Sequence, residues 1–217
     1  MEENLKKIIT IIKLNLKHNL YSIILGGSRG KNLAIENWSD YDIYIIVNKF
    51  EIEDIININN ELKKDIKEHV GITVYTVEEV EKCIVDDKTK VMFYERESMK
   101  VNPTIYGQEI NIKFELEDIK RDDEIILPKI IHELRRGILE KNYSKLIKRV
   151  TVLIKILLRK NNIFSYGYKN VFDDFYKLSA NKNIKLNEKI NIEVCIEQNN
   201  NLIYEFTKEI INNYLKY

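Results

Sequence analysis

The chain has 217 residues, with 35 lysines and arginines against 34 aspartates and glutamates, and a formal net charge of +1. Hydrophobic residues make up 44% and charged residues 32%, a composition typical of a soluble globular protein with one or two domains. The balanced charge disfavours a protein that binds long nucleic acids, because such proteins need a basic excess to displace counterions from phosphates.

The cysteines and histidines are not spaced like metal ligands. Cys83 and Cys195 stand far apart, which fits buried thiols in a reducing cytoplasm, and the histidines show no H-x-x-x-H spacing. No apolar run reaches the roughly 18 residues that span a bilayer. Residues 1–19 carry one apolar stripe between lysines and predict an amphipathic helix, so the sequence predicts a cytoplasmic protein that does not enter a membrane.

The first half of the chain alternates between strand and helix patterns. After the N-terminal helix, Thr76 and Glu79 have the spacing of a capping box and predict the start of a short helix. Further helices are predicted at 52–68 and 88–97. The predicted strands are 21–25, 41–47, 70–75 and 104–106, and a hairpin is expected to add residues 109–114 to the sheet.

From about Asp122 onwards the strand patterns disappear and apolar residues recur at helical spacing. Asp122, Asp123 and Glu124 are predicted to start a helix, where carboxylates interact favourably with the helix dipole. The predicted helices are 125–139, 143–158, 171–178, 184–196 and 202–215. The fold class expected is therefore α+β, with a mixed sheet and flanking helices in residues 1–118 and a helical bundle in residues 119–217.

The segment LGGSRG, residues 25–30, follows the first predicted strand. Its glycines allow backbone amides to approach an anion closely, and a helix that starts there adds further N–H groups. The Ser28 hydroxyl can donate a hydrogen bond to a phosphate oxygen. The segment predicts a phosphate-binding turn, although Gly-Gly-Ser by itself is also common in ordinary turns.

Asp40 and Asp42 are predicted to lie on the second strand, two residues apart. Because side chains alternate along a strand, both carboxylates are expected on one face while Tyr41 points into a core. Two carboxylates on a rigid strand can hold Mg²⁺ together, since Mg²⁺ prefers oxygen ligands. A phosphate-binding turn beside such a metal site is what the transfer of a nucleotidyl group needs.

These two motifs, ILGGSRG and SDYDIYIIV, resemble the polymerase-β-type nucleotidyltransferase superfamily, whose signature is a Gly-Ser turn followed by Asp-x-Asp. The resemblance implies an enzyme in which Asp40 and Asp42 hold the metal, while Gly27, Ser28 and Arg29 bind the nucleotide. Residues 152–160 and 164–168 are similar to a helix of several members. That similarity adds Lys155, Ser165 and Tyr166 to the nucleotide-binding residues, the alternative for Lys155 being a solvated lysine.

Members of this superfamily normally carry a third carboxylate on the next core strand. Here that strand is residues 70–75, and its open face is expected to present Gly71, Thr73 and Tyr75, none of which is acidic. Glu109 and Glu133 are the candidate substitutes. In antibiotic-modifying members an acid of the helical half deprotonates the acceptor, so the resemblance makes Glu133 a catalytic candidate. The alternative for Glu133 is ion pairing on a solvated helix face.

The expected function is Mg²⁺-dependent transfer of a nucleoside monophosphate, AMP in the leading case, from an NTP to a hydroxyl of a small molecule, with release of pyrophosphate. The resemblance to aminoglycoside- and lincosamide-type nucleotidyltransferases points to antibiotic resistance, and in that group a cleft can be shared within a homodimer. The alternatives are an antitoxin-like or catalytically impaired member that binds or nucleotidylates a protein partner, and a terminal transferase that acts on RNA.

Overall fold

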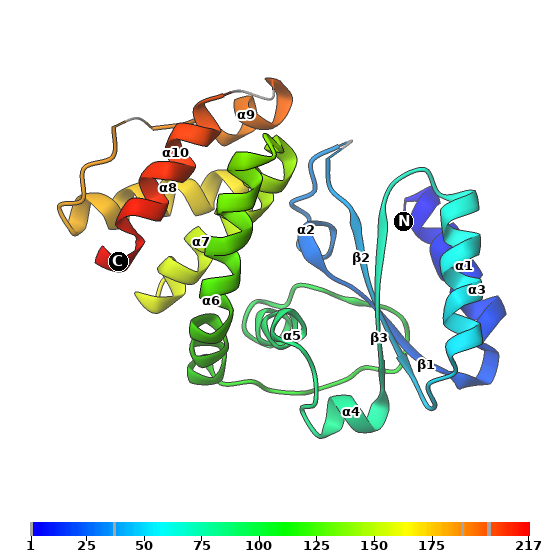
Figure 1. The fold of residues 1–217 in the computed structure, drawn as a ribbon. Coiled ribbons are helices and arrows are strands. Elements are labelled where there is room, and N and C mark those ends of the chain that lie inside the picture. Colours follow the sequence, from blue (N-terminus) through cyan, green and yellow to red (C-terminus); the bar gives the residue numbers. More distant parts are fainter. Residues whose placement is uncertain (1, 37, 188, 199–200) are drawn as a thin grey trace. The chain divides into compact units, whose positions relative to one another are not determined.

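A four-stranded mixed sheet organises the first half of the chain, as the computed structural model shows (Figure 1). The structure describes residues 2–36, 38–187, 189–198 and 201–217. The strand order is β3–β2–β1–β4, in which β1 pairs antiparallel with β2 and β4, and β2 pairs parallel with β3. The strands are β1 (Leu20–Leu25), β2 (Tyr41–Val47), β3 (Val70–Thr76) and β4 (Thr104–Gly107).

One face of the sheet is covered by helices α1 (Glu3–Leu16) and α3 (Ile52–Asp65). Tyr41, Ile43 and Ile45 of β2 point into this core and are no more than 1% exposed. The apolar stripe of the predicted N-terminal helix forms the other side of the same core, so its burial stabilises the sheet instead of a membrane contact.

The opposite face of the sheet packs against helices α4 (Val77–Glu81) and α5 (Asp87–Met99). Ile24, Tyr44 and Ile46 occupy this second core. The alternation of side chains that the sequence predicted for β2 is therefore confirmed, with each face buried under its own pair of helices. Asp42 shares the face of Tyr44 but remains exposed.

The predicted capping box opens α4. The Thr76 hydroxyl oxygen accepts a hydrogen bond from the Glu79 amide at 3.2 Å, and the Glu79 carboxylate accepts one from the Thr76 amide at 2.7 Å. The chain leaves β3 directly into this box, which is why so short a helix begins there.

The prediction of a further strand at residues 109–114 is wrong, because β4 is followed by irregular chain. The alternating apolar residues of this segment do not pair with a strand. Ile110 and Phe114 are instead buried in the second core, where the Phe114 ring lies 6.3 Å from that of Phe93 on α5. The alternating apolar residues that predict a strand here are explained by their burial in the second core.

The second unit of the chain starts at Lys120 and is helical. The predicted helices are confirmed except at residues 184–187 and 189–191, which are not helical. No helix among the described residues is both long and apolar enough to cross a membrane. The helices are α6 (Leu116–Leu139), α7 (Tyr143–Lys160), α8 (Tyr168–Asn181), α9 (Ile192–Gln198) and α10 (Leu202–Asn213).

The predicted helix start at Asp122 is also wrong, since α6 already begins at Leu116 and has Glu117 and Asp118 in its first turn. Asp123 serves another purpose inside the helix. Its carboxylate accepts two hydrogen bonds from the Arg159 guanidinium, at 2.5 and 2.7 Å, and both side chains are less than 10% exposed. This bidentate ion pair fastens α6 to α7.

We expect Arg159→Met to lower the free energy of unfolding of the second unit by about 3–5 kcal/mol, because it leaves the Asp123 carboxylate buried without its partner. Urea unfolding followed by circular dichroism measures the change. Trp38, the single tryptophan, lies in the first unit, so its fluorescence serves as the internal reference. The double variant Asp123→Leu with Arg159→Met removes both charges and is expected to recover most of the loss.

Candidate active site

The Gly-Gly-Ser segment forms a tight turn between β1 and the single helical turn α2 (Gly27–Gly30). The Gly26 amide donates a hydrogen bond to the Asp42 carbonyl at 2.8 Å, which holds the turn against the start of β2. Because α2 has only one turn, its contribution to anion binding comes from individual N–H groups and the Ser28 hydroxyl, not from a helix dipole.

Gly27 touches the carboxylate of Asp42. Its φ angle is +62°, and a Cβ atom added there would lie 1.9 Å from the Asp42 Oδ2 atom. Only glycine meets both conditions, because other residues rarely adopt this backbone conformation and have no room for the side chain. Gly27 and Asp42, which are 15 positions apart in the sequence, therefore meet at one point of the structure.

Asp40 lies just before β2, and its carboxylate lies beside His69. The Asp40 Oδ2 atom is 3.8 Å from the Nδ1 atom of His69. A Cβ atom built on Gly71 would be 3.9 Å from the His69 ring and 3.8 Å from the Asp42 Oδ1 atom. The His69 ring is thus near both the Asp40 carboxylate and the space between Gly71 and Asp42. A cleft of about 610 Å³ beside Asp40 is lined by His69 and Trp38, among others.

The third carboxylate of the superfamily is absent from β3. Gly71 is the register partner of Asp42, and Thr73 that of Tyr44, as expected from the sequence. Glu109 follows β4, which is two strands away from β2 in the sheet. Its carboxylate is bound by Arg96 and Thr104, and Thr104 pairs with Ile24 of β1.

The residues present fit a hard divalent cation. Asp42 is exposed near the start of β2, and the Gly27 backbone lies directly beside its carboxylate. Among the described residues no group of three or more acidic, histidine or cysteine side chains forms a closed metal cluster. A bound Mg²⁺ would therefore take two carboxylates from the protein and its other ligands from water and the triphosphate, as is usual for Mg²⁺.

The Tyr44 hydroxyl lies close to this site. Burial raises the pKa of Tyr44 well above its ordinary value, and the negative charge of Asp42 adds to the effect. The phenol therefore keeps its proton at neutral pH and does not serve as a base.

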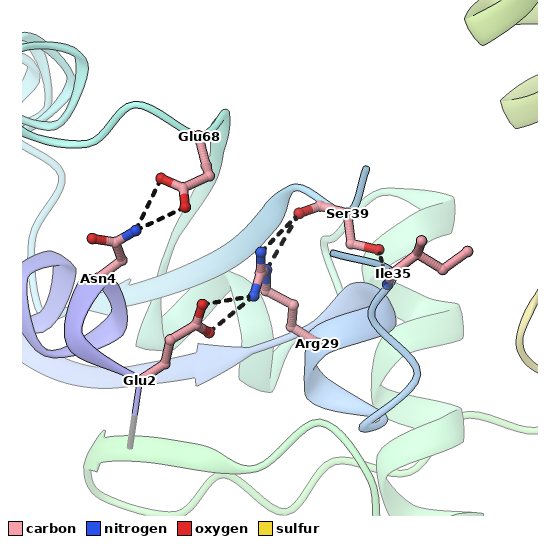
Figure 2. Close-up of polar contacts among 6 residues, drawn as sticks. All are labelled: Glu2, Asn4, Arg29, Ile35, Ser39 and Glu68. Carbon is pink, nitrogen blue, oxygen red and sulfur yellow. Dashed lines mark hydrogen bonds and ion pairs between the residues drawn. The ribbon is translucent and has the colours of Figure 1, made fainter. Parts of the chain in front are cut away.

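The guanidinium of Arg29 points away from the Asp42 carboxylate. Its guanidinium stacks on the Tyr41 ring, 3.9 Å from the ring centre, and Tyr41 faces the core beneath α1 and α3. The Asp42 side chain is on the other face of the sheet. The guanidinium instead donates hydrogen bonds to the Ser39 carbonyl and to Glu2 (Figure 2).

An ion pair that sequence reasoning missed holds the far end of α2. The Lys31 ammonium group lies 2.6 Å from the Glu95 carboxylate of α5, and both side chains are about 90% buried. These residues are 64 positions apart, and no local pattern joins them. His69 was missed for the same reason, because its position beside Asp40 depends on the pairing of β2 with β3.

The remaining predicted site residues belong to the second unit. The Glu133 carboxylate forms an ion pair with Arg149 at 2.6 Å, and Lys155 is partly exposed on α7. Ser165 is buried near Asp174, where its hydroxyl adds to the effect of Lys177 in lowering the pKa of the Asp174 carboxyl. The ion pair of Glu133 thus joins α6 to α7, and is not pairing along the solvated face of one helix.

Comparison with known proteins agrees with this geometry. The family model described as the nucleotidyltransferase domain matches residues 5–101. The match lies within the first unit, which contains both motifs. The resemblance predicted from the two motifs is confirmed, and the family match supports an enzyme of the nucleotidyltransferase type. No curated protein matches the sequence.

A solved structure resembles the chain over both of its units. Spectinomycin adenyltransferase AAD(9) from Enterococcus faecialis, crystallised with ATP and spectinomycin, is similar with a TM-score of 0.62. The two sequences are 14% identical, and the match covers 97% of this chain and 98% of the other. The likeness is one of fold, and it confirms the α+β class with its C-terminal helices.

We expect Gly27→Ala to abolish metal binding at the site, because its methyl group would displace the Asp42 carboxylate. The positive φ adds a strain of about 1–2 kcal/mol. Mn²⁺ binding measured by electron paramagnetic resonance tests the first effect, and thermal unfolding the second. Gly71→Ala is the matched control, since its methyl group meets nothing closer than 3.8 Å. Equal Mn²⁺ affinity in the two variants would contradict the assignment.

We expect Gly71→Asp to tighten Mn²⁺ binding about tenfold, because it places a third carboxylate next to Asp42 in space that is open. Gly71→Asn has the same size without the charge and is the control. Weaker binding in both variants would show that the space beside Asp42 does not accept a ligand group.

Proposed function

We propose that the chain is a Mg²⁺-dependent nucleotidyltransferase that moves AMP from ATP to a hydroxyl of a small molecule such as an aminoglycoside-like antibiotic. Pyrophosphate is the second product. The observation that carries the proposal is the contact between the Gly27 turn and the Asp42 carboxylate, which brings a phosphate-binding backbone and a metal-holding group together.

The residues of the first unit have distinct roles in this proposal. Asp40 and Asp42 hold the Mg²⁺, and the Gly27 turn and the Ser28 hydroxyl donate hydrogen bonds to the phosphates. When bound, Mg²⁺ neutralises the charge that develops on the phosphate oxygens during an in-line displacement. The protein contributes mainly by positioning, because phosphoryl chemistry demands little covalent participation from side chains.

The residues of the second unit have the roles that the resemblance implied. Lys155 binds the triphosphate, and Ser165 and Tyr166 assist it. Glu133 is the candidate that takes the proton of the acceptor hydroxyl, and its ion pair with Arg149 holds the carboxylate in place. The helical unit as a whole binds the acceptor.

The choice of donor and acceptor rests on the likeness in fold. The AAD(9) structure contains ATP and spectinomycin, and its fold matches this chain over nearly the full length of both proteins. A minimal antitoxin-like member would lack the helical unit, so the two-unit architecture favours a small acceptor.

A second candidate function is nucleotide binding without turnover. It is favoured by the absence of an acid from β3, the strand on which the superfamily normally carries its third carboxylate. Gly71 is the register partner of Asp42 on that strand. A protein of this kind would bind NTP through the same turn and act on a protein partner by binding.

The decisive assay incubates the protein with Mg²⁺, each NTP and a panel of aminoglycosides, lincosamides and spectinomycin while pyrophosphate is measured. We expect release that requires one acceptor, and a loss of at least about 100-fold in Asp42→Asn, because the metal supplies several kcal/mol of transition-state stabilisation. Glu53→Gln, which removes an exposed carboxylate from α3, is the control.

The outcomes separate the two candidate functions. A thermal shift with NTP but no pyrophosphate with any acceptor would favour binding without turnover. The absence of both would contradict the nucleotidyl-transfer proposal.

A further inference from the structure

Arg29 connects the two motifs of the site through contacts within the first unit (Figure 2). Its Nε and Nη2 atoms donate to the Ser39 carbonyl at 3.3 and 3.1 Å, and its Nη1 atom donates to the Glu2 carboxylate at 2.9 and 3.1 Å. The side chain is only 13% exposed. The backbone of Arg29 thus belongs to the turn after β1, and its guanidinium binds the residue that precedes Asp40.

The Ser39 carbonyl belongs to the peptide bond that joins Ser39 to Asp40, so its position sets where Asp40 begins. Ser39 is also held to Ile35 by two hydrogen bonds. The Ser39 hydroxyl oxygen accepts a hydrogen bond from the Ile35 amide, and the Ser39 amide donates one to the Ile35 carbonyl, both at 2.9 Å. Ser39 is held to the domain by Arg29 on one side and by β2 on the other.

Residues at the start of α1 make hydrogen bonds to Arg29, which holds Ser39, and to Glu68, which precedes His69. Glu2 binds Arg29, and two residues later the Asn4 amide donates hydrogen bonds to the Glu68 carboxylate at 2.9 Å (Figure 2). Glu68 directly precedes His69, which faces Asp40. Burial raises the pKa of the Tyr41 hydroxyl, and the nearby Glu2 carboxylate adds to the effect, which places Glu2 at the same cluster.

We propose that Arg29 is a positioning residue that sets the place of the Asp40 carboxylate relative to the Gly27 turn, with Glu2 as its anchor. The inference rests on the proposed function only in that Asp40 and Asp42 hold the metal. It replaces the phosphate contact expected from the sequence, because the guanidinium lies on the opposite face of the sheet from Asp42.

The geometry requires arginine at this position. A planar guanidinium can present two N–H groups to one carbonyl, a third to a carboxylate, and a flat face to an aromatic ring at the same time. A lysine supplies a single charged centre and cannot span both partners. Loss of comparable groups around metal ligands typically costs about 10–100-fold in metal affinity or activity.

The test compares Arg29→Met and Arg29→Lys with Lys7→Met, which breaks an exposed ion pair with Glu3 in the same helix α1. We expect Arg29→Met to weaken Mn²⁺ binding, measured by electron paramagnetic resonance without nucleotide, about 10–100-fold. kcat should fall by a similar factor, and the KM for ATP should change less than about threefold. Arg29→Lys should lie between Arg29→Met and the wild type, and Lys7→Met should match the wild type.

Two results would overturn the inference. A rise of about tenfold or more in the KM for ATP, with unchanged Mn²⁺ affinity, would show that Arg29 binds phosphate directly. A lower melting temperature with unchanged Mn²⁺ affinity, kcat and KM would show that its role is only structural.

Two readouts separate failure of this inference from failure of the proposed function. If the wild type binds Mn²⁺ but transfers no nucleotide, the proposed function fails and the Mn²⁺ affinities still decide the role of Arg29. Amide hydrogen exchange of peptides that contain Ser39 must also become faster in Arg29→Met. Unchanged exchange would overturn the inference whatever the metal affinity, and a wild type that binds no Mn²⁺ would overturn both proposals.

Discussion

The hydrogen bond from the Gly26 amide to the Asp42 carbonyl is the contact on which the geometry of the site depends. It extends the antiparallel pairing of β1 with β2 by one step, beyond the pair Leu25 and Ile43. The next residue, Gly27, must then turn sharply with a positive φ, and this brings its backbone against the Asp42 carboxylate. The glycine turn and the Asp42 carboxylate, the two parts of the candidate site, are thus adjacent because β1 ends beside the start of β2.

The burial of the sheet on both faces makes this arrangement rigid. Strand β2 is covered by α1 and α3 on one side and by α4 and α5 on the other, so its hydrophobic residues cannot shift register without exposing an apolar face. Within β2 only Asp42 is exposed, and Asp40 lies just before the strand. The candidate site residues are therefore at one end of a strand whose remaining length stabilises the domain.

Local patterns predicted much of this domain. The alternation in β2, the capping box at Thr76 and the stripe of α1 each depend on residues close together in the chain, and each was confirmed. The same method failed where tertiary burial imitates a pattern. Residues 109–114 alternate like a strand because Ile110 and Phe114 contact the second core, and Asp123 was taken for a helix start although it pairs with Arg159 inside the bundle.

By itself, the sequence determined the chemistry available: a glycine turn, two aspartates on a strand, and no acid on the strand beside them. These follow from residue types at short spacing, where backbone geometry leaves few choices. Only the tertiary structure decided that Arg29 turns towards Ser39 and Glu2, that His69 lies beside Asp40, and that Glu109 binds Arg96 and Thr104. Those facts depend on strand order and on contacts between residues far apart in the chain, which no local pattern encodes.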